Sequence, residues 1–151
     1  MMGVIKVNHF WIPMPDGTRL GARLWMPDGK DSYPAILEYI PYRKDDYTVK
    51  RDSNTVAHFA KHGYACIRVD MRGSGSSDGI PYDEYTDQEI DDGVVVIDWI
   101  ASQSWCNGKV GTMGISWGGI TGLQLAQRSP DALKTIISLG STDQRYYDDG
   151  G

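Results

Sequence analysis

One stretch of the chain decides the fold: residues 109–128, which read KVGTMGISWGGITGLQLAQR. Residues 109–115 are expected to form a strand and residues 117–128 a helix. Between them lies Gly114-Ile115-Ser116-Trp117-Gly118, in which a serine occupies a tight, strained turn and the glycines prevent a steric clash. Such a pentapeptide often arises by chance, but its place between a strand and a helix makes it specific. The stretch therefore predicts an exposed Ser116 at the end of a strand.

The rest of the chain alternates strands and helices around this turn. Strands are expected at 4–12, 18–26, 34–40, 64–70, 109–115 and 133–140, and helices at 54–62, about 86–103 and 117–128. Pro15-Asp16-Gly17-Thr18 is a turn, so the first two strands form an antiparallel hairpin. The later alternation favours a parallel sheet covered on both faces. The sequence predicts an α/β protein with one domain over residues 1–151.

The helix that starts near Thr86 is the clearest of the chain. Thr86 and Glu89 have capping-box spacing, and the acids of the first turn suit the positive end of the helix dipole. Its buried face is expected to carry Ile90, Val94, Ile97 and Ala101. The acidic stretch 83–92 is compatible with a metal site, but a solvated first helical turn explains it better.

Composition narrows the range of functions. The net charge of −5 argues against nucleic acid or an anionic membrane as a partner. No apolar run approaches the roughly 20 residues of a membrane helix, and the N-terminus has no charged leader before an apolar run. Cys66 and Cys106 are expected to be free and buried, which fits a reducing, cytoplasmic compartment. No spacing of Cys and His is typical of a zinc site.

The predicted turn has the first requirements of nucleophilic catalysis. A serine hydroxyl needs an exposed position, a base to take its proton and donors that stabilise the oxyanion. Ser116 supplies the exposed position. The backbone N–H of Trp117 lies at a helix N-terminus, where the dipole favours negative charge, and is one expected donor. A second donor is expected from the loop after the third strand, Pro41-Tyr42-Arg43-Lys44-Asp45.

Four spaced segments follow one another along the chain: Pro41–Lys44, Asp70–Gly79, Trp105–Gly111 and Gly114–Gly119. Together they resemble the X-prolyl dipeptidyl-peptidase and cocaine-esterase (CocE/NonD-type) family of α/β-hydrolases, in the N-terminal portion of its catalytic domain. The resemblance implies an α/β-hydrolase fold, with Ser116 as the nucleophile that accepts the acyl group. It implies that Tyr42 donates its hydroxyl to the oxyanion beside the Trp117 amide. It further implies small ester, amide or Xaa-Pro peptide substrates, and neither metal nor organic cofactor.

The sequence departs from this family at the catalytic base. In α/β-hydrolases the triad runs Ser, then Asp or Glu, then His along the chain. Here His9, His58 and His62 all precede Ser116, and a solvated or packing role is expected for the last two. Asp143 follows a strand after Ser116, but the resemblance places the triad acid further on. The family's later strands, cap and β-sandwich are missing as well, so we expect a truncated part of the catalytic domain.

Two interpretations therefore stay open. The first is a serine hydrolase that uses Ser116, with a base and an acid from outside this chain. The second is a non-catalytic fragment or scaffold, without triad Asp and His, that forms a homo-oligomer through the unpaired edge of its last strand. The Gly-rich loop 73–79 fits neither a dinucleotide motif nor a P-loop and is expected to be a turn at the edge of the active site. Residues 43–46 are expected to form a surface loop.

Overall fold

The structure is a computed structural model, and it describes residues 3–144. The described part contains six strands: β1 (Val4–Pro13), β2 (Arg19–Pro27), β3 (Tyr33–Ile40), β4 (Ala65–Asp70), β5 (Cys106–Ile115) and β6 (Leu133–Leu139). It also contains three helices: α1 (Val49–Lys61), α2 (Asp87–Ser102) and α3 (Trp117–Arg128). All of these elements are predicted by the sequence, and most of their ends lie within one residue of the predicted position. The exceptions are the starts of β5 and α1, which come three and five residues earlier.

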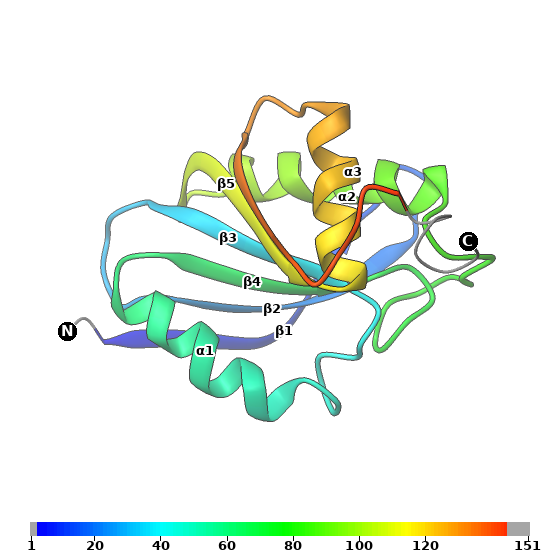
Figure 1. The fold of residues 1–151 in the computed structure, drawn as a ribbon. Coiled ribbons are helices and arrows are strands. Elements are labelled where there is room, and N and C mark those ends of the chain that lie inside the picture. Colours follow the sequence, from blue (N-terminus) through cyan, green and yellow to red (C-terminus); the bar gives the residue numbers. More distant parts are fainter. Residues whose placement is uncertain (1–2, 145–151) are drawn as a thin grey trace.

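The strands form a single sheet in the order β1-β2-β4-β3-β5-β6. β1 pairs with β2 and β2 with β4 in antiparallel fashion, whereas β4, β3, β5 and β6 are parallel. Helix α1 covers one face of this sheet, and α2 and α3 cover the other (Figure 1). Helix α1 connects β3 to β4, which is a step toward β1 in the sheet. Helices α2 and α3 connect β4 to β5 and β5 to β6, which are steps toward the opposite edge. Right-handed crossovers therefore place α1 opposite the other two helices.

The sheet has a core on each face. The larger core lies beneath α2 and α3, and the smaller one, beneath α1, contains Trp25 and Cys66. Both Cys66 and Cys106 are free and buried, as predicted, and burial raises the pKa of the Cys66 thiol to about 12. A thiol held neutral in this way packs as a small apolar side chain.

The buried face of α2 differs from the predicted one. Ile90 and Ile97 are buried, but Val94 and Ala101 are only half-buried, and Val96 and Ile100 take the central places. The helix turns this way because Gly93 lies against Leu125 of α3 and Tyr39 of β3. A Cβ at Gly93 would be 2.8 Å from Leu125 Cδ2 and 3.1 Å from Tyr39 Cε1.

Helix α1 begins at Val49, five residues before the predicted start at residue 54. Its first turn is polar, so apolar periodicity gives no sign of it. Asp52 of this turn is nevertheless fully buried, and it accepts a hydrogen bond of 2.7 Å from the Thr48 hydroxyl. Its Oδ2 also lies 3.4 Å from Arg68 Nε of β4, so an ion pair holds the first turn of the helix against the sheet.

Among residues 3–144, no helix combines the length and the apolar character that crossing a membrane requires. The same residues contain no group of three His, Cys, Asp or Glu side chains that could hold a metal ion.

Candidate active site

Ser116 occupies the strained turn that the sequence predicts. It lies between β5 and α3 with φ 56° and ψ −116°, is exposed, and is the N-cap of α3. A non-glycine residue in such a conformation costs about 1–3 kcal/mol, so surrounding contacts must hold it there. Its N–H donates to the Leu139 carbonyl of β6 at 2.8 Å. Its carbonyl accepts from the N–H groups of Gly119 and Ile120 at 2.9 and 3.0 Å. Backbone bonds on both sides therefore fix the turn.

The glycines of the turn are required by close backbone approaches. A Cβ at Gly114 would lie 2.3 Å from the carbonyl carbon of Gly118. A Cβ at Gly118 would lie 2.5 Å from Ile40 Cγ2, at the end of β3. Real Cβ atoms do not tolerate such distances, so the predicted steric role of both glycines is confirmed. The approach of Ile40 also shows that α3 starts directly against the end of β3.

The two expected oxyanion donors lie at the same edge of the sheet. Trp117 is the first residue of α3, where a backbone N–H has no partner within the helix. Tyr42 is half-buried two residues beyond the end of β3, and its ring centroid lies 6.4 Å from that of Tyr47. Because β3 and β5 are parallel neighbours, the loop that carries Tyr42 and the turn that carries Ser116 leave the sheet at adjacent strand ends.

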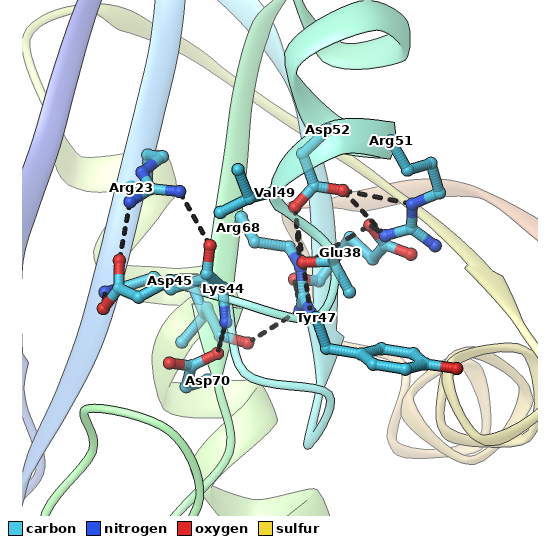
Figure 2. A network of polar contacts seen from close by, with 12 residues as sticks. Arg23, Glu38, Lys44, Asp45, Tyr47, Val49, Arg51, Asp52, Arg68 and Asp70 are labelled. Atoms are coloured by element: carbon cyan, nitrogen blue, oxygen red, sulfur yellow. Dashed lines mark hydrogen bonds and ion pairs between the residues drawn. The ribbon is translucent and has the colours of Figure 1, made fainter.

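The loop after β3 is not the simple surface loop that the sequence suggests. The side chain of Lys44 is completely buried, with Nζ 2.7 Å from Asp45 Oδ2. Arg23 of β2 donates to the Lys44 carbonyl at 2.7 Å and to Asp45 Oδ1 at 2.6 Å (Figure 2). The expectation of a surface loop is therefore wrong for Lys44, because Arg23, far away in the sequence, holds this segment against the sheet.

Asp70, at the end of β4, connects this loop with the Gly-rich loop. It is fully buried, and its Oδ1 accepts from the Lys44 N–H at 2.8 Å. Its Oδ2 accepts from the Ser76 N–H at 3.1 Å. Gly75 has φ 54°, and a Cβ there would lie 2.1 Å from Asp70 Oδ2. The Gly-rich loop thus folds around an internal carboxylate, and at least one of its N–H groups is already used by Asp70.

A buried network of charges lies beneath the ends of β3 and β4. Arg68 is 1% exposed, and its Nε lies 3.4 Å from Asp52 Oδ2 and 3.7 Å from Glu38 Oε2. Arg51 donates to Glu38 Oε2 at 2.6 Å (Figure 2). Burial raises the pKa of Glu38, and the charges of Arg68 and Arg51 oppose that rise. This network ties α1 to the strands that lead into the candidate site.

Glu89 of α2 is a site residue that the sequence analysis missed. The Thr86 hydroxyl caps the helix as predicted, since it accepts from the Glu89 N–H at 3.2 Å. The Glu89 carboxylate, however, accepts from Trp117 Nε1 at 2.9 Å and from the Thr121 hydroxyl at 3.1 Å. Burial raises the pKa of Glu89, although these two hydrogen bonds oppose the rise. The acid stretch is thus not wholly solvated, because Glu89 faces α3.

A cavity of about 240 Å³ lies beside Trp117. Its walls are mostly apolar and come from the end of β3, the loop after β4 and the start of α3. They include Tyr39, Pro41, Met71, Ile80 and Trp117, together with the carboxylate residue Glu89. The cavity therefore lies between the residue before Tyr42 and the residue after Ser116.

None of the three histidines lies near Ser116. His58 and His62 are exposed, and their ring centroids are 4.4 Å apart at the end of α1, next to the start of β4. That edge of the sheet is opposite the one that carries Ser116. His9 belongs to β1, four strands away from β5, which is roughly 19 Å at the usual spacing of strands. The predicted solvated or packing role of His58 and His62 agrees with these positions.

The fold and the turn define the class of protein. A hairpin followed by parallel strands, with a strained serine after a central strand, matches the N-terminal part of known α/β-hydrolase structures. The sequence pattern of the X-Pro dipeptidyl-peptidase (S15) family matches residues 16–150. The chain therefore belongs to that family.

Individual relatives support this assignment. The chain is 35% identical over 149 residues to cocaine esterase from Rhodococcus sp. (strain MB1 Bresler), which covers 95% of this chain and 26% of that protein. A CocE/NonD family hydrolase from Staphylococcus aureus superimposes with a TM-score of 0.84 at 25% identity, over 95% of this chain and 28% of that one. An α-amino acid ester hydrolase superimposes with a TM-score of 0.74 at 28% identity, over 92% and 25%. The chain thus spans about a quarter of the length of these relatives.

Proposed function

We propose that residues 1–151 are part of the catalytic domain of a serine hydrolase in which Ser116 attacks the carbonyl carbon of an ester or amide. The observation that carries the proposal is the strained, exposed serine at the start of α3, held by the backbone of β6 and by close glycine contacts. Nothing in the packing of a strand and a helix requires a strained serine there. Strain of this kind clusters at functional sites.

In the proposed reaction, the Ser116 oxygen forms a bond to the substrate carbonyl carbon, and the carbonyl oxygen becomes an oxyanion. The Trp117 N–H and the Tyr42 hydroxyl donate to this oxygen. The leaving alcohol or amine departs with a proton, and water then hydrolyses the acyl-enzyme. The proton of Ser116 is taken by a base other than the three histidines of this chain, because those lie on distant parts of the sheet.

The names of the relatives point to the class of substrate. They include a cocaine esterase and an α-amino acid ester hydrolase, and the family is described by its X-Pro dipeptidyl-peptidases. We therefore propose small acyl esters or amides, including Xaa-Pro peptides, as substrates.

A second candidate function is a non-catalytic scaffold, and the last strand of the described sheet, β6, favours it. β6 is the last strand of the described sheet, and Ile137 and Leu139 on it are about half exposed, at 49% and 48%. The open backbone edge of such a strand pairs readily with another chain, and the exposed side chains beside it add apolar contact area. We propose that this edge would form a homo-oligomer if the chain has no catalytic role.

Labelling of Ser116 separates the two candidates. The chain is treated with a fluorophosphonate probe and with a p-nitrophenyl ester, beside Ser116→Ala and the control Ser104→Ala, which alters an exposed serine outside the site. Without a triad histidine we expect slow labelling and slow turnover, because a triad acts as a unit and loss of the base removes most of the activation of the serine. Labelling and turnover should disappear in Ser116→Ala only. Equal reactivity of wild type and Ser116→Ala would leave the scaffold as the better description.

A further inference from the structure

We propose that Glu89 is a positioning residue that sets the direction of the Trp117 backbone N–H by holding the first two turns of α3 through Trp117 and Thr121. This inference rests on the proposed function, because that N–H is the proposed oxyanion donor. Glu89 itself lies on α2 and reaches the site only through these contacts.

The geometry of the carboxylate carries the inference. Glu89 Oε1 accepts both from Trp117 Nε1 at 2.9 Å and from the Thr121 hydroxyl at 3.1 Å. Trp117 and Thr121 are four residues apart and lie on the same face of the helix. A single oxygen therefore binds α3 at two successive turns. Glu89 Oε2 accepts from the Tyr85 N–H at 3.2 Å. With donors on both oxygens, the carboxylate cannot rotate without losing a bond, and a rotation of α3 about its axis would break the bonds to Trp117 and Thr121.

The main chain of Glu89 is held as firmly as its side chain. The Tyr39 hydroxyl, from β3, donates to the Glu89 carbonyl at 3.1 Å. The start of α3 lies against the same strand, since Gly118 approaches Ile40. The donor network around Glu89 therefore joins β3, α2 and α3 at the point where the proposed oxyanion donors emerge. A small rotation of α3 there would turn the Trp117 N–H away, and a misplacement of about 1 Å costs on the order of a hundredfold in rate.

A carboxylate suits this place because its side-chain partners, the Trp117 indole, the Thr121 hydroxyl and the Tyr85 N–H, all donate hydrogen bonds. The N-terminus of α3 also favours negative charge. Burial opposes ionisation and raises the pKa of Glu89. The groups that surround it are Glu84, whose charge raises the pKa further, and Asp83 and Arg72, which line the same cavity. The Tyr39 hydroxyl is bound to the Glu89 main chain. Glu89 should therefore lose its charge at a higher pH than an exposed glutamate.

Heteronuclear NMR on the isotope-labelled chain tests the inference without any reaction. The indole and backbone N–H signals of Trp117 are followed from about pH 3 to pH 8, a range that includes the usual glutamate pKa of about 4.3 and extends well above it. We expect both signals to move together, with a common midpoint above that of an exposed glutamate. The movement should be lost in Glu89→Gln and kept in Asp98→Asn, which removes an exposed acid from the same helix.

Two results would overturn the inference. One is a Trp117 backbone N–H that does not titrate while the indole does, since the carboxylate would then hold only the side chain. The other is a full titration that persists in Glu89→Gln. If that variant does not fold, Trp117→Phe replaces it: the backbone N–H of residue 117 must then titrate less than in wild type, and an unchanged titration contradicts the inference.

Reactivity gives an independent readout. We expect Glu89→Gln, which keeps an acceptor for Trp117, to label with fluorophosphonate faster than Glu89→Ala, and both to label more slowly than wild type. If wild type does not label at all, the proposed function fails for this chain, while the NMR titration still decides the role of Glu89. If wild type and Glu89→Ala label at the same rate, the positioning role fails and the nucleophile stands.

Discussion

The two faces of the sheet are held together by different forces. Beneath α2 and α3 the contacts are apolar and closely packed, with Val96, Ile97 and Ile100 completely buried. Beneath α1 the core is small, and paired charges around Arg68 take the place of apolar contacts. The face that supports Ser116 is therefore the well-packed one, which suits a turn that must be kept under strain.

The α1 face is also the less complete of the two. A cavity of about 350 Å³ lies beside α1 over β3, β5 and β6, lined by apolar residues such as Phe59, Met113 and Ile137. Ile115 and Leu139 are about half exposed, at 50% and 48%. Exposed apolar area of this kind marks contact surfaces. The difference teaches that the described sheet is well covered on the face of α2 and α3 and partly open on the face of α1.

The largest effect is expected on the charged face. Arg68→Met removes the positive centre of the network and leaves Glu38 and Asp52 buried with less compensation. Loss of one partner of a buried ion pair costs about 3–5 kcal/mol, and urea unfolding at neutral pH measures it. The double variant Arg68→Met/Asp52→Asn should recover part of the loss, because it removes one of the stranded charges. No recovery would mean that Arg68 acts mainly through packing.

A matched pair of isoleucines tests the difference between the faces directly. Ile97→Ala, in the closed core beneath α2, should destabilise the chain by about 2–5 kcal/mol. Ile137→Ala, on the open side of β6, should change the stability by about 0.5 kcal/mol or less. Urea midpoints of both variants are compared at several protein concentrations. A large, concentration-dependent loss for Ile137→Ala would show that a second chain covers this face beside the open edge of β6.

The smallest expected effect is a dependence of stability on pH, and it has the same sign on both faces. Burial raises the folded-state pKa of Glu38 on one face and of Glu89 on the other. A raised pKa means that the native chain binds protons more readily than the unfolded one. The stability is then greatest below the unfolded value of 4.5 and declines as the pH rises through each folded pKa.

Unfolding midpoints above about pH 4.5 should therefore fall less steeply in Glu89→Gln than in wild type. The exposed acids Asp16 and Asp78, whose pKa values are lowered by Arg72 and Arg19, act in the opposite direction. Their effect is confined to pH below 3.8, the unfolded value, so the two contributions are separable. An identical slope for Glu89→Gln and wild type above pH 4.5 would contradict the buried position of Glu89.

The sequence predicts the elements and the strained turn at Ser116 because both depend on local patterns. Alternating apolar residues mark the strands, and a serine between glycines marks the turn after β5. The buried charges are invisible to such patterns, because their partners lie far apart along the chain. Lys44 and Asp45 are fixed by Arg23, and Glu89 is turned inward by Trp117, 28 residues later. The capping-box spacing already accounts for a glutamate at position 89. The sequence therefore does not indicate the bonds of Glu89 to Trp117 and Thr121.

The hydrogen bond between the Ser116 N–H and the Leu139 carbonyl has a dynamic consequence. The peptide group of the serine is anchored to the outermost strand of the described sheet, and outermost strands fray more readily than central ones. Each opening of β6 then releases the turn as well, so Ser116 should exchange its amide hydrogen at the rate of β6 rather than at the slower rate of β5. A neighbouring strand laid along β6 would slow that exchange and steady the serine at the same time.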